Sequence, residues 1–325
     1  MTAPKLIPVF GLLGDVETVY GDGGTLTAAL DGILLTEPTP MTVAYAHGGE
    51  RPIAVGTAGT LQRAAPSGRS GEFTPRVEAR GAGAAYSATV LPPDIDTLMR
   101  ISGHAQTLDV TASLETVTYD PESAPASYES GGFEAYTRGQ LFTMASAYAT
   151  LSFLIEGPSF MVFEATVMGT LSDPTDVALP VITYNTTLPP KAISLALAIG
   201  AITGTAVRRI AWTQNRNIAP RLDMNNADGH KGFSPGRRES TLEILVEAEA
   251  FATWDPYADW KAATVRNITF TIGSVQYNKV TFNAVQAQVA NVTEEEDGPT
   301  ALWGVTFNLG SSDGASNDEY QFVWD

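Results

Sequence analysis

The amino-acid sequence predicts a mainly β protein. Two stretches, 240–250 and 301–309, alternate apolar and polar residues with a period close to two, and both are rich in residues that favour strands. Convincing helical patterns are few. The chain has 325 residues, of which 44% are hydrophobic, so it can build one large core or two modest ones.

Two short segments nevertheless predict helices. The first, 93–102, opens with a proline and two acidic residues and is followed by Gly103, which suits a helix end. The second is 255–263, where Asp255 can cap the free amides and the next residue is a proline in the first helical position. We expect one helix in each half of the chain.

The segments around the two helices follow a similar order. Strand-like segments 73–79 and 241–248 precede the helices, and hairpin-like segments 153–167 and 270–284 follow them. An internal duplication would produce this order, but alternating strands also resemble one another by chance. The sequence therefore leaves both explanations open.

A polar linker divides the chain. Prolines bracket residues 180–192, which are otherwise rich in polar residues. We therefore predict an N-terminal domain, 1–185, and a C-terminal domain, 186–325. The N-terminal domain carries an insertion over about 104–140 that is rich in turn formers and tyrosine, and long loops of this kind are often binding loops or arms.

The composition argues against several kinds of site. The chain has no cysteine, so it has no disulfide and no thiolate ligand or nucleophile. Its three histidines match no zinc spacing, and the polar stretch 223–229 misses the spacing of a calcium loop. No nucleophile stands beside a base in a recognisable pattern. We predict no cofactor, no metal and no enzymatic activity.

Charge and hydropathy limit the partners. Acidic residues outnumber basic ones 36 to 19, for a net charge of −17, whereas a chain that grips phosphates needs the reverse. The longest weakly polar run, 192–207, is shorter than the ~20 residues of a membrane span. We predict that this run forms a strand and that the protein has no membrane partner.

The order of these features resembles the major tail tube proteins of siphophages, the bacteriophages with long, non-contractile tails. No single motif is specific, and the resemblance lies in their succession over most of residues 10–310. The stretches that match are 17–21, 72–79, 94–103, 119–123, 156–169, 210–215 and 220–229.

The resemblance implies two tail-tube-like β-sandwich or barrel domains, each with a short flanking helix. Subunits would join edge to edge into rings, and rings would stack into a tube. Many members have a single domain and form hexamers. This chain is about twice as long, so three copies would complete a pseudo-sixfold ring, which we favour over a hexamer.

The resemblance also implies partners and a location. Besides other copies of the chain, the partners would be the tape measure protein, the tail tip and the tail terminator. DNA would pass through the lumen during ejection without specific binding. The protein would be made in the bacterial cytoplasm and would end in the virion tail.

Two groups of residues are candidates for assembly surfaces. An arm that contacts the next ring would use aromatic residues, which give large contact areas at little entropy cost, but a loop folded over its own domain explains them equally well. This group is Tyr119, Asp120, Tyr128, Phe133 and Tyr136. An acidic lumen face would use Glu243, Glu247 and Glu249, of which the last two share one face of the expected strand, although a solvated outer face is an equal explanation.

Two other functions stay open from the sequence. One is a different virion β-protein, such as a tail terminator or decoration protein. The other is a carbohydrate-binding or adhesin-like module, which would expose Trp254, Trp260 or Trp303 as stacking platforms.

Overall fold

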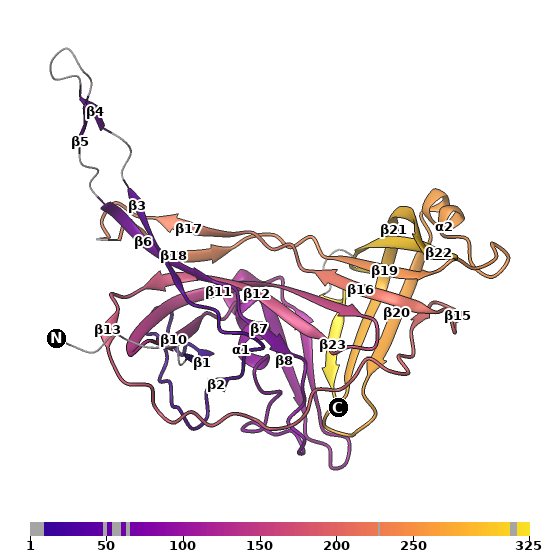
Figure 1. The fold of residues 1–325 in the computed structure, drawn as a ribbon, viewed down its shortest axis with the longest axis horizontal. Coiled ribbons are helices and arrows are strands. Elements are labelled where there is room, and N and C mark those ends of the chain that lie inside the picture. Colours follow the sequence, from indigo (N-terminus) through magenta and orange to yellow (C-terminus); the bar gives the residue numbers. More distant parts are fainter. Residues whose placement is uncertain (1–9, 48–50, 54–59, 63–65, 227, 313–316) are drawn as a thin grey trace.

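The computed structural model describes residues 10–47, 51–53, 60–62, 66–226, 228–312 and 317–325. The chain is mainly β, as predicted, with 49% strand and 6% helix. Figure 1 shows the N-terminal and C-terminal halves side by side, joined by strands that run between them.

The N-terminal half holds the first fifteen elements. In chain order they are β1 (Phe10–Val16), β2 (Gly32–Ile33), β3 (Thr42–His47), β4 (Arg51–Ile53), β5 (Thr60–Gln62), β6 (Pro66–Phe73), β7 (Arg76–Glu78), α1 (Asp96–Ile101), β8 (His104–Asp109), β9 (Thr116–Pro121), the 3-10 helix η1 (Pro125–Ser127), β10 (Gly131–Thr137), β11 (Gln140–Glu156), β12 (Val162–Leu171) and β13 (Thr175–Asp176).

The C-terminal half follows an extended linker. Its elements are β14 (Ala198–Ile199), β15 (Ile202–Thr203), β16 (Val207–Thr213), β17 (Ile218–Leu222), β18 (His230–Pro235), β19 (Thr241–Glu247), α2 (Pro256–Ala262), β20 (Val265–Ile272), β21 (Val280–Asp297), β22 (Thr300–Leu309) and β23 (Gln321–Trp324).

One antiparallel sheet crosses both halves, and we call it the central sheet. Its strands pair in the order β7, β12, β11, β16, β19, β22 and β21. Buried and less buried residues alternate along β12, β16 and β19, because successive side chains of a strand point to opposite faces. One face of the central sheet therefore covers the core, and the other, which we call the polar face, points away from it.

The core is continuous between the halves. The ring of Phe153 on β11 lies 5.7 Å from Trp212 of β16 and 6.1 Å from Phe270 of β20, measured between centroids. The C-terminal strand β23 pairs with β21 and also with β9 of the other half. The two halves thus pack on a shared set of aromatic side chains, and the division into 1–185 and 186–325 stays a prediction.

The two helices were predicted with different accuracy. Helix α2 begins and ends within one residue of the predicted segment, and Asp255 caps it by accepting hydrogen bonds from the amides of Tyr257 and Ala258, both at 3.0 Å. Helix α1 begins only at Asp96, because Asp94 adopts a φ of 66° and turns its carboxylate toward other parts of the chain.

The insertion over 104–140 differs from the expected long loop. It consists largely of β8, β9, η1 and β10, and most of its turn-forming residues lie in the short connections between these strands or at strand ends. The run 192–207 likewise contains two short strands, β14 and β15, and not one long one. In the part of the chain that the structure describes, no helix has the length and apolar content needed to cross a membrane.

Candidate assembly interface

The halves join through a strand pair inside the chain. Residues 152–156 of β11 pair antiparallel with 209–213 of β16, so that Leu154 faces Ala211. The ladder continues at both ends, where Gly157 donates its amide to the carbonyl of Arg208 and Gln214 donates to that of Leu151, each at 2.9 Å. We call this pairing the internal junction.

The last part of β21 has an open edge. Over residues 291–297 one edge pairs with β22, and within the described residues no strand pairs with the opposite edge, since β20 reaches only Gln288. The four acidic residues 294–297 are all exposed. Unpaired strand edges bind other strands, and charged side chains on them limit indiscriminate pairing.

The amides that face this open edge can be identified. The amide of Leu309 donates to the carbonyl of Ser240, next to β19. The amides of every second residue of β22, counted from Leu309, therefore point to β19, and the amides between them point to β21. Because successive amides of a strand point to opposite sides, the amides of Glu294 and Glu296 point to the open edge of β21. These two amides are available to a further strand.

A second open edge lies at the other end of the central sheet, at residues 34–36. Leu35 forms a bridge with Val77 of β7, and Thr36 donates its amide to the carbonyl of Arg76 at 2.9 Å. Asp94 accepts the amide of Leu34 at 2.6 Å. The sheet therefore ends on one side at β21 and on the other at this segment.

Asp94 is buried and unusually placed for an acid. Burial raises its pKa to about 6, although the hydrogen bond from Leu34 and the guanidinium of Arg80, 3.2 Å away, favour the charged form. Beside the segment 34–36 lies a hollow of about 200 Å³, lined mainly by Phe10, Leu12, Ile33, Leu34, Leu35 and Tyr184. Thr36, Glu37 and Pro38 complete the lining, so the second edge combines a fixed backbone with a hollow of mixed polar and apolar lining.

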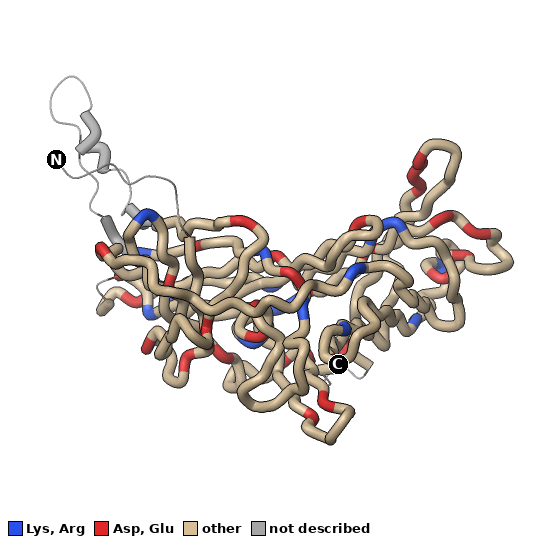
Figure 2. Tube along the Cα trace, turned by 60° about the horizontal axis from the view of Figure 1, so that its bottom comes forward, with Lys and Arg blue, Asp and Glu red and all other residues tan. Residues whose placement is uncertain are grey.

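The predicted acidic residues lie partly on the polar face. Glu243 and Glu247 alternate with the buried side chains of β19, and they pair with Arg209 and, at 2.6 Å, with Arg208. Glu249 lies beyond the end of β19. Figure 2 shows acidic residues spread along the coloured part of the trace, and in the sequence they outnumber basic residues 36 to 19. The acids of this face are therefore partly neutralised by neighbouring arginines.

The predicted arm residues are not gathered in one protruding element. Tyr119 and Phe133 are fully buried, and Tyr136 is 8% exposed. Asp120 accepts a hydrogen bond from Gln321 at 2.9 Å, and the ring of Tyr128 lies 4.2 Å from the guanidinium carbon of Arg216. Contact of this segment with another ring stays a prediction, for which Tyr128 and Asp120 are the more accessible residues.

Two hairpins that were not predicted from the sequence extend from the central sheet. Strands β3 and β6 pair as a ribbon that carries β4 and β5 at its end and projects from the N-terminal half (Figure 1). Strands β17 and β18 form the second hairpin. A signal existed for the latter, because the stretch 223–229 between its strands is rich in turn-forming residues.

The β17–β18 hairpin lies on the N-terminal half. Ile218 and Phe233 form a small apolar cluster with Tyr148 of β11, against which Met168 of β12 packs. Nε2 of His230 donates to the carbonyl oxygen of Arg69 on β6 at 2.8 Å. This contact connects the halves in addition to the internal junction and the pairing of β23 with β9.

The remaining candidate chemistry finds no support in the geometry. Among the described residues no group of three or more histidine, aspartate or glutamate side chains could hold a metal ion. Trp254 and Trp303 are 2% and 5% exposed, so they are not free stacking platforms, whereas Trp260 is 43% exposed. The accessible features of this molecule are strand edges and hairpins.

Comparison with known proteins identifies the family. A family model described as phage tail tube protein matches residues 11–311, which is most of the chain. No curated protein matches the chain. Proteins of this family are structural, which confirms the expectation that the chain is not an enzyme. The match supports the sequence resemblance, and the chain belongs to the phage tail tube protein family.

Proposed function

We propose that this chain is the major tail tube subunit of a siphophage, that three copies close into a ring, and that stacked rings form the channel for DNA ejection. Membership of the family already implies a structural tail protein that assembles into a tube. The observation that carries the finer proposal is the pairing of the two halves at the internal junction.

Strand pairings support a repeat in the two halves. In the N-terminal half, neighbouring strands pair in the order β2, β1, β10, β11, β12 and β7. In the C-terminal half, β15 pairs with β14, followed in the same way by β20, β21, β22 and β19. Each helix follows the corresponding strand, β7 or β19. We infer that the halves share one plan.

The residue pairs support the same correspondence. Val207 pairs with Val246 at the start of β16, as Leu35 pairs with Val77 in the N-terminal half. Further along these strands, the corresponding pairs are Thr213 with Thr241 and Thr42 with Glu72. The open segment 34–36 is therefore the counterpart of the start of β16, and β21 is the counterpart of β11.

This correspondence suggests how rings close. Inside the chain residues 209–213 of β16 pair with β11, so their counterparts, which follow the segment 34–36 and end at Thr42, would pair with the open edge of β21 in the neighbouring subunit. Repeating the contact closes the central sheets into a barrel that has no free edge. The three-subunit ring follows from two such domains per chain in a family whose single-domain members form hexamers.

The two hollows are consistent with this closure. At the internal junction the hollow beside β16 measures about 40 Å³ and is covered by Ile155 and Gly157 at the end of β11. Beside the segment 34–36 the hollow is about 200 Å³. A neighbouring β21 would reduce the larger hollow by covering it in the same way.

The polar face would line the channel. Hydroxyl and acidic side chains predominate on it, and the arginines Arg76, Arg208 and Arg209 are engaged by Glu164, Glu247 and Glu243. Because these guanidinium groups are paired with carboxylates, fewer of them can form salt-dependent ion pairs with DNA phosphates. We propose that DNA passes this surface without specific binding, and that the tape measure protein, the tail tip and the tail terminator are the tube's other partners.

The experiment that tests this proposal compares two substitutions at one position. Glu296→Pro removes an amide from the open edge of β21, and proline is tolerated where a strand edge faces solvent. Negative-stain electron microscopy of the wild type and of Glu296→Ala is expected to show rings or tubes, with three- or sixfold end views. Glu296→Pro is expected to stay monomeric while keeping the same circular dichroism. Rings of Glu296→Pro as abundant as those of Glu296→Ala would contradict the proposed closure.

A further inference from the structure

The turn between β20 and β21 in the C-terminal half rests on the N-terminal half. The carbonyl of Tyr277 accepts hydrogen bonds from the amide of Gly83 at 3.1 Å and from the hydroxyl of Tyr86 at 3.0 Å. The side chain of Asn278 accepts the amide of Gly81 at 2.8 Å. The approach is close, since a Cβ at Gly81 would lie 2.0 Å from the carbonyl oxygen of Tyr277. This turn therefore docks on the segment that follows β7.

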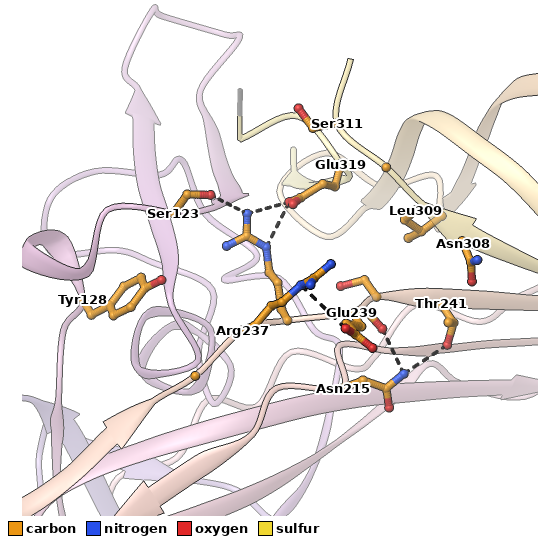
Figure 3. A pocket seen from close by; sticks show the side chains of 14 residues that line it. Ser123, Tyr128, Asn215, Arg237, Glu239, Thr241, Asn308, Leu309, Ser311 and Glu319 are labelled. Atoms are coloured by element: carbon orange, nitrogen blue, oxygen red, sulfur yellow. Dashed lines mark hydrogen bonds and ion pairs between the residues drawn. The ribbon is translucent and has the colours of Figure 1, made fainter. Parts of the chain in front are cut away.

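Another contact between the halves depends on the insertion 104–140. Arg238 donates to the hydroxyl of Ser123 at 2.9 Å and binds Glu319 at 2.7 Å, beside a hollow of about 670 Å³ that both halves line (Figure 3). The C-terminal half has no such insertion, because only residues 263 and 264 connect α2 to β20. At the open side of the C-terminal half, this contact therefore cannot be repeated, whereas the contact of the turn can.

The position that would receive such a turn on the C-terminal half follows from the register of the strands. Ala79, just beyond β7, and Ala248, just beyond β19, each donate an amide at 2.9 Å to a residue at or just before the start of β12 or β22, respectively. Because β7 and β19 are counterparts, Gly81 corresponds to Ala250. We call residues 249–251 the landing segment.

The landing segment is accessible and has unused polar groups. Phe251 is 62% exposed, and its ring stacks on Trp303 with the centroids 5.6 Å apart. Among the described residues Glu249 has no ion-pair partner, and the amide of Ala250 donates no hydrogen bond. A carboxylate, a free amide and an aromatic ring thus follow one another in the chain.

The corresponding turn of the N-terminal half lies between β10 and β11. Thr137 pairs with Gln140 across this turn, which consists of Arg138 and Gly139. Both turn residues are exposed, and in the part of the chain that the structure describes no acid pairs with Arg138. A Cβ at Gly139 would meet no atom within 4 Å. The turn is shorter than its counterpart between β20 and β21, but the long side chain of Arg138 extends its reach.

We propose that the β10–β11 turn of the adjacent copy in the same ring binds the landing segment, with Arg138 paired to Glu249. This inference rests on the proposed ring closure, in which the N-terminal half of one copy lies against the C-terminal half of the next. The opposite charges of the two side chains favour the contact. The free amide of Ala250 would donate to a carbonyl of the turn, as the amide of Gly81 donates to Asn278 inside the chain.

Exchanging the two charges tests this contact. Arg138→Glu places like charges together and is expected to raise the protein concentration needed for ring assembly roughly threefold relative to Lys191→Glu. Lys191 is exposed and outside the proposed contacts, and its replacement changes the net charge equally. Arg138→Glu with Glu249→Arg restores an opposite pair and is expected to assemble as the wild type does. Sedimentation velocity measures assembly, and circular dichroism checks the fold. Equal assembly of Arg138→Glu and Lys191→Glu, or a double variant no better than Arg138→Glu, would overturn the proposal.

Cross-linking separates this contact from the ring closure and from contacts between rings. The chain has no cysteine, so Arg138→Cys with Glu249→Cys can be joined by a bismaleimide after assembly, with Arg138→Cys and Lys191→Cys as the control variant. Covalent species are expected to stop at three copies, because contacts within a ring close on themselves, and the control variant is expected to stay monomeric. Longer species, or equal cross-linking of the control, would overturn the contact. Rings that form without this cross-link would refute the contact and leave the closure standing, whereas a wild type that forms no rings would refute both.

Discussion

A single buried residue, Asp94, connects the open edge of the central sheet to the interior. Its carboxylate accepts the amide of Leu34 and faces Arg80, and its own backbone has a left-handed φ of 66°. Such conformations are uncommon for residues with a side chain and persist where surrounding contacts fix them. The segment that is proposed to meet the next subunit is thus held by a buried acid.

The raised pKa of Asp94 predicts a pH dependence. Its folded pKa of about 6 lies above the ordinary value of 3.8, so its contribution to stability is fully present below pH 3.8 and is lost as the pH rises through about 6. The loss is on the order of 3 kcal/mol. In a Glu296→Pro background, which is expected to keep the chain monomeric, Asp94→Asn is expected to remove this slope. Urea unfolding at steps between pH 3.8 and 7 measures it, and parallel curves for both proteins would contradict the assignment.

His104 predicts the opposite dependence. It is 2% exposed, and burial lowers its pKa to about 3 from the ordinary value of 6.5. The neutral ring is therefore favoured in the folded state, and its contribution is present above pH 6.5 and is lost as the pH falls toward 3, by roughly 1.4 kcal/mol per pH unit. His104→Gln is expected to flatten the fall in the free energy of unfolding over this window. An unchanged slope in the same titration would refute the prediction.

Elements differ in how far local sequence determines them. Helix α2 was predictable because its cap and its proline are adjacent in sequence. The start of α1 was not, because it depends on Asp94 meeting Leu34 and Arg80, which are distant in the chain. The insertion 104–140 was misjudged because turn residues predict turns without predicting that the strands between them pair.

The candidate site was harder to predict than the fold class. Alternation identifies a strand but not its neighbours, so the open edges at 34–36 and 291–297 become visible only when every pairing is known. Glu243 and Glu247 were correctly placed in a strand, whereas Glu249 follows it. Tyr119 and Phe133 of the expected arm are buried. The sequence could not distinguish this outcome, because a large apolar side chain suits a core as well as an interface.

The N-cap residue of α2, Asp255, is expected to contribute measurably to the stability of the protein. Asp255→Ala removes the acceptor of two amide hydrogen bonds and is expected to lower the free energy of unfolding by about 1 kcal/mol. Asp255→Asn keeps an acceptor and is expected to recover most of the loss. Urea denaturation of both variants measures the difference, and equal losses would argue against the cap.

The whole molecule carries a net charge of −17, and its open β21 edge holds four exposed acids. Subunits that approach through this edge repel one another, and salt screens that repulsion over a Debye length of about 10 Å at 0.1 M. We expect rings and tubes to form at lower protein concentration as sodium chloride rises from 0.02 to 0.3 M, because the Debye length shortens roughly fourfold over that range. Sedimentation velocity across the series measures this, and a shift toward monomers with salt would contradict it.

The internal junction determines where a ring can come apart on dilution. Because β11 and β16 belong to one chain, their pairing is intramolecular and its effective concentration does not change with dilution. In a ring of such chains, alternate junctions would be tethered and the others would depend on protein concentration. We expect dilution to open a ring only at its β21 edges, so that it separates into whole chains whose two halves remain paired.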